Sequence, residues 1–346
     1  MRSVASRLGI GSNSNRGCRR AGGAGGMRPW PSAILWRCKQ AGKGMGALSS
    51  RIRGSIEKFL GRLEDSERSA LLLGRLLAQR LASRDSIESL RDVEFQVFSQ
   101  FGDDGIIQWL VHHVDFPNTT FIEFGVEDYQ ESNTRFLMMN DNWSGFVMDG
   151  SEANVARITA APYYWRHELT ARAAFVDTAN VNQLLASSGF HRDVGILHID
   201  LDGNDYWIWA AIEAISPVIV ILEYNSVFGS ERAITIPYGA NFRRTDAHHS
   251  NLYWGASLRA LQRLSSDKGY AFIGCNSAGN NAYFVRRDKL QDPVRETSVE
   301  QGYVRSKFRE SRDQAGRLTY LTGTQRLEAI LGLPVRNVVS GLIEEL

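Results

Sequence analysis

The sequence has no long hydrophobic run and no paired cysteines. Its longest apolar stretches, such as 217–222 (PVIVIL), are far shorter than the roughly 20 residues of a membrane-spanning helix, so we expect no membrane span. The three cysteines, Cys18, Cys38 and Cys275, show no spacing typical of a disulfide framework or of a thiolate zinc site. Cysteine usage of this kind favours a reducing compartment, and we predict a cytoplasmic protein.

Acidic residues are absent from the first 56 residues, which carry eleven Lys and Arg. This segment is rich in Gly, Ser and Arg and has no sustained apolar period, which is typical of disorder. We therefore predict a basic disordered arm over 1–55. Two interpretations stay open: an organelle-targeting segment, or a start placed too early, with Met27 or Met45 as the true first residue; we favour the second.

The remainder, 57–346, carries 29 basic against 38 acidic residues. An acidic body of this kind would repel phosphates, so we expect no nucleic-acid partner. Apolar residues recur at helical spacing over 56–81, which predicts a helical extension over 56–94 that packs or forms a homodimer. An amphipathic run at 324–333, ended by Pro334, predicts a helical tail over 291–346 that dimerises or caps the acceptor pocket.

Between 95 and 290, short apolar runs alternate with amphipathic segments. Five strands are predicted, at 119–126, 144–151, 172–177, 195–202 and 217–225. Their apolar residues fall on both alternating sets, which is typical of a parallel sheet covered by helices on both faces. A short Asn/Gly/Ser turn between the last two strands, near 276–280, requires an antiparallel hairpin. The predicted fold is α/β: a doubly wound, Rossmann-like seven-stranded sheet of five parallel strands plus this closing hairpin.

Four motifs stand along this domain: FSQFGDDGII (98–107), FIEFGV (121–126), MDGS (148–151) and HIDLDGNDYWIW (198–209). In order and spacing, residues 95–288 resemble class I S-adenosylmethionine-dependent methyltransferases, and most of all the FkbM-type sugar and small-molecule enzymes. The resemblance implies O-methylation of a sugar or other small polar acceptor. The sequence departs from the family in the turn after the first strand, which has one glycine instead of two or three.

The resemblance also implies cofactor contacts at successive strand ends. Gly125 lies in the turn that lets the backbone approach the cofactor, and Glu123 lies beside the methionine ammonium. Asp149 accepts both ribose hydroxyls, Asp177 reads the adenine amine, and Gln100 is a further contact from the segment folded over this end of the sheet. The alternative for Asp149 and Asp177 is that they cap the helices that follow.

Carboxylates crowd the ends of the fourth and fifth predicted strands, where Asp200, Asp202, Asp205, Glu223 and Asn225 meet at one edge of the sheet. Two interpretations stay open. In the first, Asp200, Asp202, Glu223 and Asn225 bind Mg²⁺ or Mn²⁺. In the second no metal is needed: Asp200 acts as general base or orients the acceptor, Asp202 bonds turn amides and Asp205 caps a helix.

The segment 226–257 is too long for a simple connection and is predicted to form the acceptor side of the site. It carries His248 and His249, each a candidate base or ligand, and Arg243 and Arg244, candidates for pairing with an acceptor's carboxylate or phosphate. Two rival functions stay open: a non-catalytic binding module on the same fold, and an NAD(P)-dependent oxidoreductase. The closing hairpin and the lack of a Gly-x-Gly-x-x-Gly turn disfavour the second.

Overall fold

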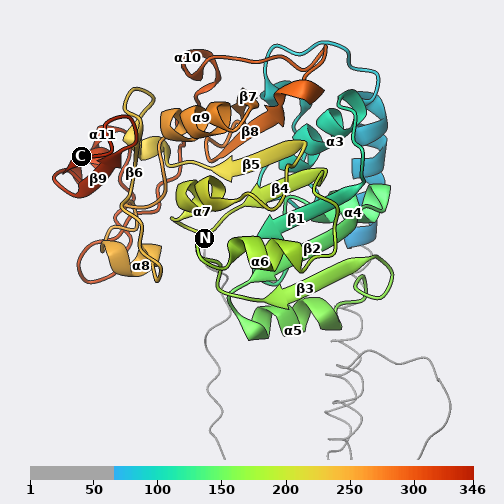
Figure 1. The fold of residues 1–346 in the computed structure, drawn as a ribbon, viewed down its shortest axis with the longest axis horizontal. Coiled ribbons are helices and arrows are strands. Elements are labelled where there is room, and N and C mark those ends of the chain that lie inside the picture. Colours follow the sequence, from blue (N-terminus) through green and yellow to red (C-terminus); the bar gives the residue numbers. More distant parts are fainter. Residues whose placement is uncertain (1–65) are drawn as a thin grey trace, which may run out of the picture.

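A seven-stranded sheet forms the centre of the computed structural model, which describes residues 66–346. The strand order is β3-β2-β1-β4-β5-β8-β7 (Figure 1). The first five strands pair in parallel, and β8 joins β5 and β7 antiparallel. The strands are β1 (Thr120–Phe124), β2 (Ser144–Asp149), β3 (Leu169–Ala173), β4 (Ile196–Ile199), β5 (Ile219–Glu223), β7 (Tyr270–Cys275) and β8 (Asn281–Arg286). The predicted Rossmann-like sheet with its closing hairpin is confirmed.

Helices cover both faces of this sheet, because successive strand residues point to opposite sides. Phe121 of β1 enters one hydrophobic core with α3 (Asp103–His113), α4 (Arg135–Asp141) and α5 (Glu152–Ala160). Its neighbour Ile122 enters the other core, with α6 (Val181–Ala186), α7 (Asp205–Ala211) and α9 (Leu258–Asp267). The two cores explain why the central strands carry apolar residues on both faces, with Glu123 of β1 and His198 of β4 as buried polar exceptions.

One strand lies away from its predicted position. We predicted the third strand at 172–177, but β3 spans Leu169–Ala173 and pairs Leu169 with Gly145 of β2. As the edge strand it buries only Leu169, so its sequence has little of the apolar pattern that marks the inner strands. The apolar residues that suggested a strand lie just beyond it, where Phe175 is exposed and Val176 packs in the core.

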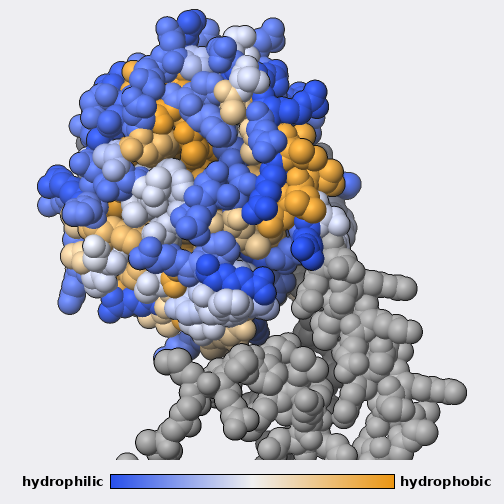
Figure 2. Space-filling model, turned by 90° about the vertical axis from the view of Figure 1, so that its right-hand side faces the viewer, coloured by the Kyte–Doolittle hydropathy of each residue, from blue (hydrophilic) through white to orange (hydrophobic). Residues whose placement is uncertain are grey.

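The N-terminal extension is a helix over 66–81 followed by the short helix η1 (Leu90–Val93). The predicted disordered arm and the start of the predicted helix lie outside the described residues. Figure 1 draws the helix in blue at the right, and Figure 2 shows a compact hydrophobic patch on that side of the molecule. Four leucines of this helix are more than two-fifths exposed: Leu72, Leu73, Leu76 and Leu77. Homodimerisation through this extension stays a prediction.

The C-terminal tail is less helical than its amphipathic run suggested. Its helices are α10 (Val299–Gly302) and α11 (Thr324–Glu328), and the chain then forms β9 (Pro334–Asn337) and β10 (Ile343–Glu345). These strands pair with β6 (Ile234–Thr235) in a small sheet of order β10-β9-β6. Val335 and Ile330 pack against Ile234, so the tail folds back onto the 226–257 insertion.

Three short helices complete the chain: η2 (Ser226–Phe228), α8 (Arg244–Ala247) and η3 (Arg287–Lys289). The first two lie in the insertion, so they follow β5 on the side toward which the parallel strands point (Figure 1). None of the helices in residues 66–346 is long and apolar enough to cross a membrane.

Candidate functional site at the carboxyl ends of the strands

The strand order reverses between β1 and β4, and the turn after β1 passes directly over the end of β4. A Cβ atom at Gly125 would lie 1.7 Å from the carbonyl oxygen of Asp200, and Gly125 has φ +75°. Only glycine fits there. The same turn holds Glu127 at φ 47° and Tyr129 at φ 61°, both in the left-handed region that non-glycine residues rarely adopt. Strain of this kind concentrates at functional sites.

Asp149 ends β2 and holds this turn in place. Its Oδ2 accepts a hydrogen bond from the Glu127 amide at 2.9 Å, while Oδ1 accepts from the Ser151 amide and from Asn154 Nδ2. The cap of the next helix is Ser151, whose hydroxyl accepts from the Asn154 amide. Asp149 is therefore an oriented, half-buried carboxylate beside the β1 turn rather than a helix cap.

Asp177 has a local role in the structure. Its Oδ1 accepts hydrogen bonds from the amides of Ala179 and Asn180, immediately before α6. These contacts are those of the capping alternative. Gln100 is exposed, and its backbone carbonyl accepts a hydrogen bond from Gln96. The adenine contact of Asp177 and the cofactor contact of Gln100 stay predictions.

Glu123 lies in a closed hydrogen-bond network. It is 2% exposed, and Oε1 accepts from His198 Nδ1 at 2.9 Å and from the Asn133 amide at 3.0 Å. Oε2 accepts from the hydroxyls of Ser132 and Thr134 and from the Thr134 amide. Burial alone would raise the pKa of Glu123, but the bonds from His198 and the hydroxyls hold it below its usual value. The carboxylate is already saturated by protein donors, so an ammonium contact would have to displace one of them.

Asp200 and Glu223 contrast with this network. The register pairs Ile199 with Leu222, so these two acids come next on adjacent strands. Burial, followed by the charge of Asp202, raises the pKa of Asp200 to about 7. Burial and the charge of Asp200 raise the pKa of Glu223 well above its usual value. Within the described part of the chain, the buried Oε2 of Glu223 has no hydrogen-bond partner.

More acids continue this row along the edge of the sheet. Burial raises the pKa of Glu127, as do the charges of Asp128, Asp149 and Asp202. The prediction that Asp205 caps α7 is wrong, because the N-cap is Asn204. Asp205 instead accepts hydrogen bonds from the amides of Leu201 and Gly203 within the turn. Burial raises the pKa of Asp205 to about 6. The site is therefore an acidic rim from β2 to β5.

Arg244 is the cation that faces this rim. Its guanidinium lies 3.3 Å from Asp202 Oδ1 and 4.7 Å from the centre of the Trp254 ring, and its Nε donates to the Asn251 carbonyl. Asp202 thus pairs with the insertion instead of bonding the amides of its own turn. The Asp202 side chain is 69% exposed, so this ion pair compensates little of the buried charge.

The predicted metal ligands do not come together as a set. Asn225 is buried, with Nδ2 donating to the carbonyls of Leu252 and Trp254 and Oδ1 accepting from the Val227 amide. Asn225 therefore anchors the insertion. Across residues 66–346, no group of three His, Cys, Asp or Glu side chains is arranged to hold a metal ion. Binding of a divalent ion by Asp200, Asp202, Glu223 and Asn225 therefore stays a prediction, which this arrangement does not support.

The two predicted histidines lie after α8 on the insertion. His248 Nδ1 pairs with the Ser250 hydroxyl at 2.8 Å, the two imidazole rings lie 4.1 Å apart, and His249 is exposed. Partial burial lowers the pKa of His248, as does the neighbouring His249. The structure gives neither histidine a contact with Asp200 or Glu223, and their catalytic role stays a prediction.

Residues 236–242 of the insertion lie at this edge of the sheet. Trp207 Nε1 donates to the Ile236 carbonyl at 2.9 Å and Asn204 Nδ2 to the Gly239 carbonyl at 2.9 Å. The Thr178 hydroxyl, beyond β3, donates to the hydroxyl of Tyr238 at 3.0 Å. The insertion is therefore tied to the loops after both β3 and β4, at the rim where ligands of such sheets bind.

No protein-family model matches the chain, and no curated protein matches it. Among solved structures, the chain is similar to the O-methyltransferase from Bacillus cereus in complex with SAH, with 11% identity and a TM-score of 0.34 over 62% of this chain and 89% of that chain. The N-terminal domain of EvdMO1 with SAH bound matches with 12% identity and a TM-score of 0.32, over 49% of this chain and 73% of that chain. The geranyl diphosphate C-methyltransferase from Streptomyces coelicolor A3(2), in complex with Mg²⁺, geranyl diphosphate and S-adenosyl-L-homocysteine, matches with 13% identity and a TM-score of 0.30, over 48% and 57%. The fold assignment rests on the strand order itself.

Proposed function

We propose that this chain is an S-adenosylmethionine-dependent methyltransferase that methylates a hydroxyl of a sugar or another small polar acceptor. The observation that carries the proposal is the pair of uncompensated carboxylates, Asp200 and Glu223, at the switch point of a Rossmann-like sheet. Half-buried acids that receive no hydrogen bonds are costly, so a cationic ligand would relieve them. A sulfonium donor is cationic.

Two further features support the same ligand. The carboxylate of Asp149 is held by Glu127, Ser151 and Asn154, and an oriented carboxylate suits a ribose diol, which offers two O–H donors. The backbone of the turn at Gly125 packs tightly on β4, so the floor of the site is built before any ligand binds. The donor set of the rim, carboxylates without a metal-like arrangement, fits an organic cation.

The residues of the rim suggest how the reaction proceeds. S-adenosylmethionine, when bound, supplies a methyl group activated by the sulfonium. Asp200, with its pKa at about 7, can accept the proton that the acceptor hydroxyl loses as the new carbon–oxygen bond forms and the carbon–sulfur bond breaks. The loops from 226–257 would exclude water and hold the acceptor in line, which supplies much of the rate in such displacements.

Titration calorimetry with S-adenosylhomocysteine tests this proposal on the full chain. The wild-type protein should bind with a Kd in the micromolar range, about 8 kcal/mol. Asp149→Asn should weaken binding about tenfold, because it removes one acceptor of a bidentate contact. The matched control is Asp193→Asn, an acid before β4 that pairs with Arg286, and it should bind as the wild type does. Absence of heat with the wild-type protein would overturn the proposal and favour a non-catalytic binding module.

A further inference from the structure

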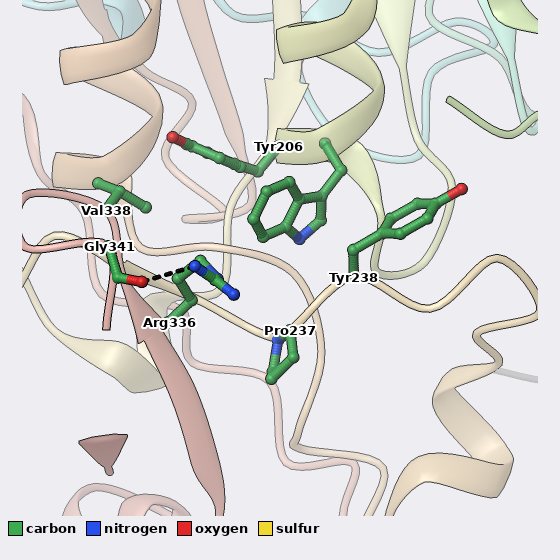
Figure 3. A pocket seen from close by; sticks show the side chains of 7 residues that line it. Tyr206, Pro237, Tyr238, Arg336, Val338 and Gly341 are labelled. Atoms are coloured by element: carbon green, nitrogen blue, oxygen red, sulfur yellow. Dashed lines mark hydrogen bonds between the residues drawn. The ribbon is translucent and has the colours of Figure 1, made fainter. Parts of the chain in front are cut away.

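A second feature of the rim is a pocket of about 450 Å³ next to α7. Figure 3 shows the side chains of Tyr206, Tyr238 and Arg336 around its opening, contributed by α7, the insertion and β9. The pocket therefore exists only because the tail folds back onto the insertion. Its lining residues are Tyr206, Trp207, Pro237, Tyr238, Arg336, Val338 and Gly341.

Three aromatic rings line this pocket, and the polar edges of two of them, Trp207 and Tyr238, are already bonded. The ring centres of Tyr206 and Trp207 lie 5.2 Å apart, and those of Trp207 and Tyr238 lie 6.1 Å apart. Trp207 Nε1 donates to the Ile236 carbonyl, and Thr178 holds the Tyr238 hydroxyl. These bonds fix the two rings, and the Arg336 guanidinium lies 5.9 Å from the centre of the Trp207 ring. Aromatic side chains beside a cation suit a ligand with a flat or chair-shaped ring that carries a negative charge.

Arg336 places an unneutralised cation in the same pocket. Its Nη1 donates to the Gly341 carbonyl at 2.6 Å, as the dashed line in Figure 3 marks, but its buried Nε has no partner in residues 66–346. The described part of the chain also offers it no ion pair, whereas Arg232, just before β6, pairs with Glu344 of β10. A guanidinium with unpaired N–H groups matches a carboxylate, which it can bind through two parallel bonds.

We propose that this pocket binds a six-membered ring that carries a carboxylate, with the ring against its three aromatic side chains and the carboxylate on Arg336. Arg244, the expected anion partner, is instead engaged by Asp202 and Trp254. Tyr206 follows Asp205 directly, so the pocket opens beside the turn that carries the acidic rim. The ligand's role as methyl acceptor rests on the proposed function, whereas the binding itself does not.

The experiment measures binding of two such acids to the full chain by calorimetry. Glucuronate and 4-hydroxybenzoate are the probes, and glucose and 4-hydroxybenzamide are their uncharged counterparts. At least one acid should bind about tenfold more tightly than its counterpart, and which one binds separates a sugar from an aromatic ligand. Arg336→Gln should remove this preference. Equal binding of acid and counterpart, or no binding of either acid, overturns the proposal.

Two further variants separate charge, ring packing and folding. Arg309→Gln is the matched control, because Arg309 lies over an aromatic ring, that of Tyr320, as Arg336 lies over that of Trp207, but is outside the pocket. This variant should bind like the wild type. Tyr206→Leu should weaken the preferred acid about tenfold and leave the preference for charge intact. If Tyr206→Leu, shown to be folded by its thermal melt, binds like the wild type, the ring assignment is wrong.

S-adenosylhomocysteine titrated into the same proteins distinguishes the two proposals. Arg336→Gln should keep the wild-type affinity for it, since Arg336 lies in the acceptor pocket. Binding of a ring acid without S-adenosylhomocysteine binding would sustain the pocket and overturn the methyltransferase. Binding of S-adenosylhomocysteine without binding of either acid would sustain the methyltransferase and overturn the proposed ligand of the pocket.

Discussion

Glu123 and Glu223 are the same residue type in the same sheet, yet their surroundings are opposite. Glu123 receives hydrogen bonds from His198, Asn133, Ser132 and Thr134, and its pKa lies below its usual value. Glu223 has a buried oxygen without a partner and a pKa well above its usual value. The comparison shows that an acid at a strand end is not by itself a site. The acid that the fold leaves without donors is the one that we propose to bind a ligand.

The largest expected effect comes from neutralising the satisfied acid. Burial lowers the pKa of His198, and the hydrogen bond and charge of Glu123 raise it above its usual value. Glu123→Gln removes that charge and places an amide among hydrogen-bond donors. We expect a loss of about 3–5 kcal/mol in the free energy of unfolding, the usual cost of breaking a buried pair. Urea denaturation at pH 7 measures it. A loss below about 1 kcal/mol would mean that the network does not hold the end of β1 together.

The same substitution at the other acid should have the opposite sign. Glu223→Gln removes a charge that the folded protein disfavours, so we expect a gain of about 1–3 kcal/mol at pH 8. Urea denaturation measures it beside Glu123→Gln, which serves as the matched variant. A loss of stability would show that Glu223 has partners and would remove the contrast.

The pH dependence sharpens the comparison through Asp200. Its pKa is raised from 3.8 to about 7, so the folded protein holds a proton that the unfolded chain releases, and stability falls as the pH rises between those values. The stability of Asp200→Asn relative to the wild type should be near zero at pH 4, grow with pH and level off above about pH 7, at about 1–3 kcal/mol. A difference that is constant from pH 4 to pH 8 would contradict the raised pKa.

The smallest effect is expected from the cation that faces the rim. Arg244→Gln should lower stability at pH 8 by less than about 1 kcal/mol, because its partner Asp202 is mostly exposed. In the Glu223→Gln background this loss should shrink, since part of the attraction is to Glu223. Urea denaturation of the wild type, the two single variants and the double variant gives the coupling energy between Arg244 and Glu223. An equal loss of stability in both backgrounds would show that Arg244 does not act on Glu223.

The sheet could be predicted because inner parallel strands carry apolar residues on both faces, and only the edge strand β3, which buries one residue, was displaced. The acids at the strand ends were also predictable, since parallel strands end at one edge. The contacts that each of these acids makes could not be predicted. The donors to Glu123 come from 132–134 and from β4, and Arg336 reaches its pocket because Val335 packs in a core about 100 residues away in sequence. Local patterns carry no such long-range information.

The sulfonium itself provides the most direct test, because S-adenosylmethionine carries this charge and S-adenosylhomocysteine does not. Calorimetry should show that the wild-type protein prefers S-adenosylmethionine, and that the preference falls about tenfold in the Asp200→Asn, Glu223→Gln double variant while affinity for S-adenosylhomocysteine is kept. If the double variant retains the full preference, or if the wild-type protein binds neither compound, the unpaired acids do not hold a cationic methyl donor and the account is wrong.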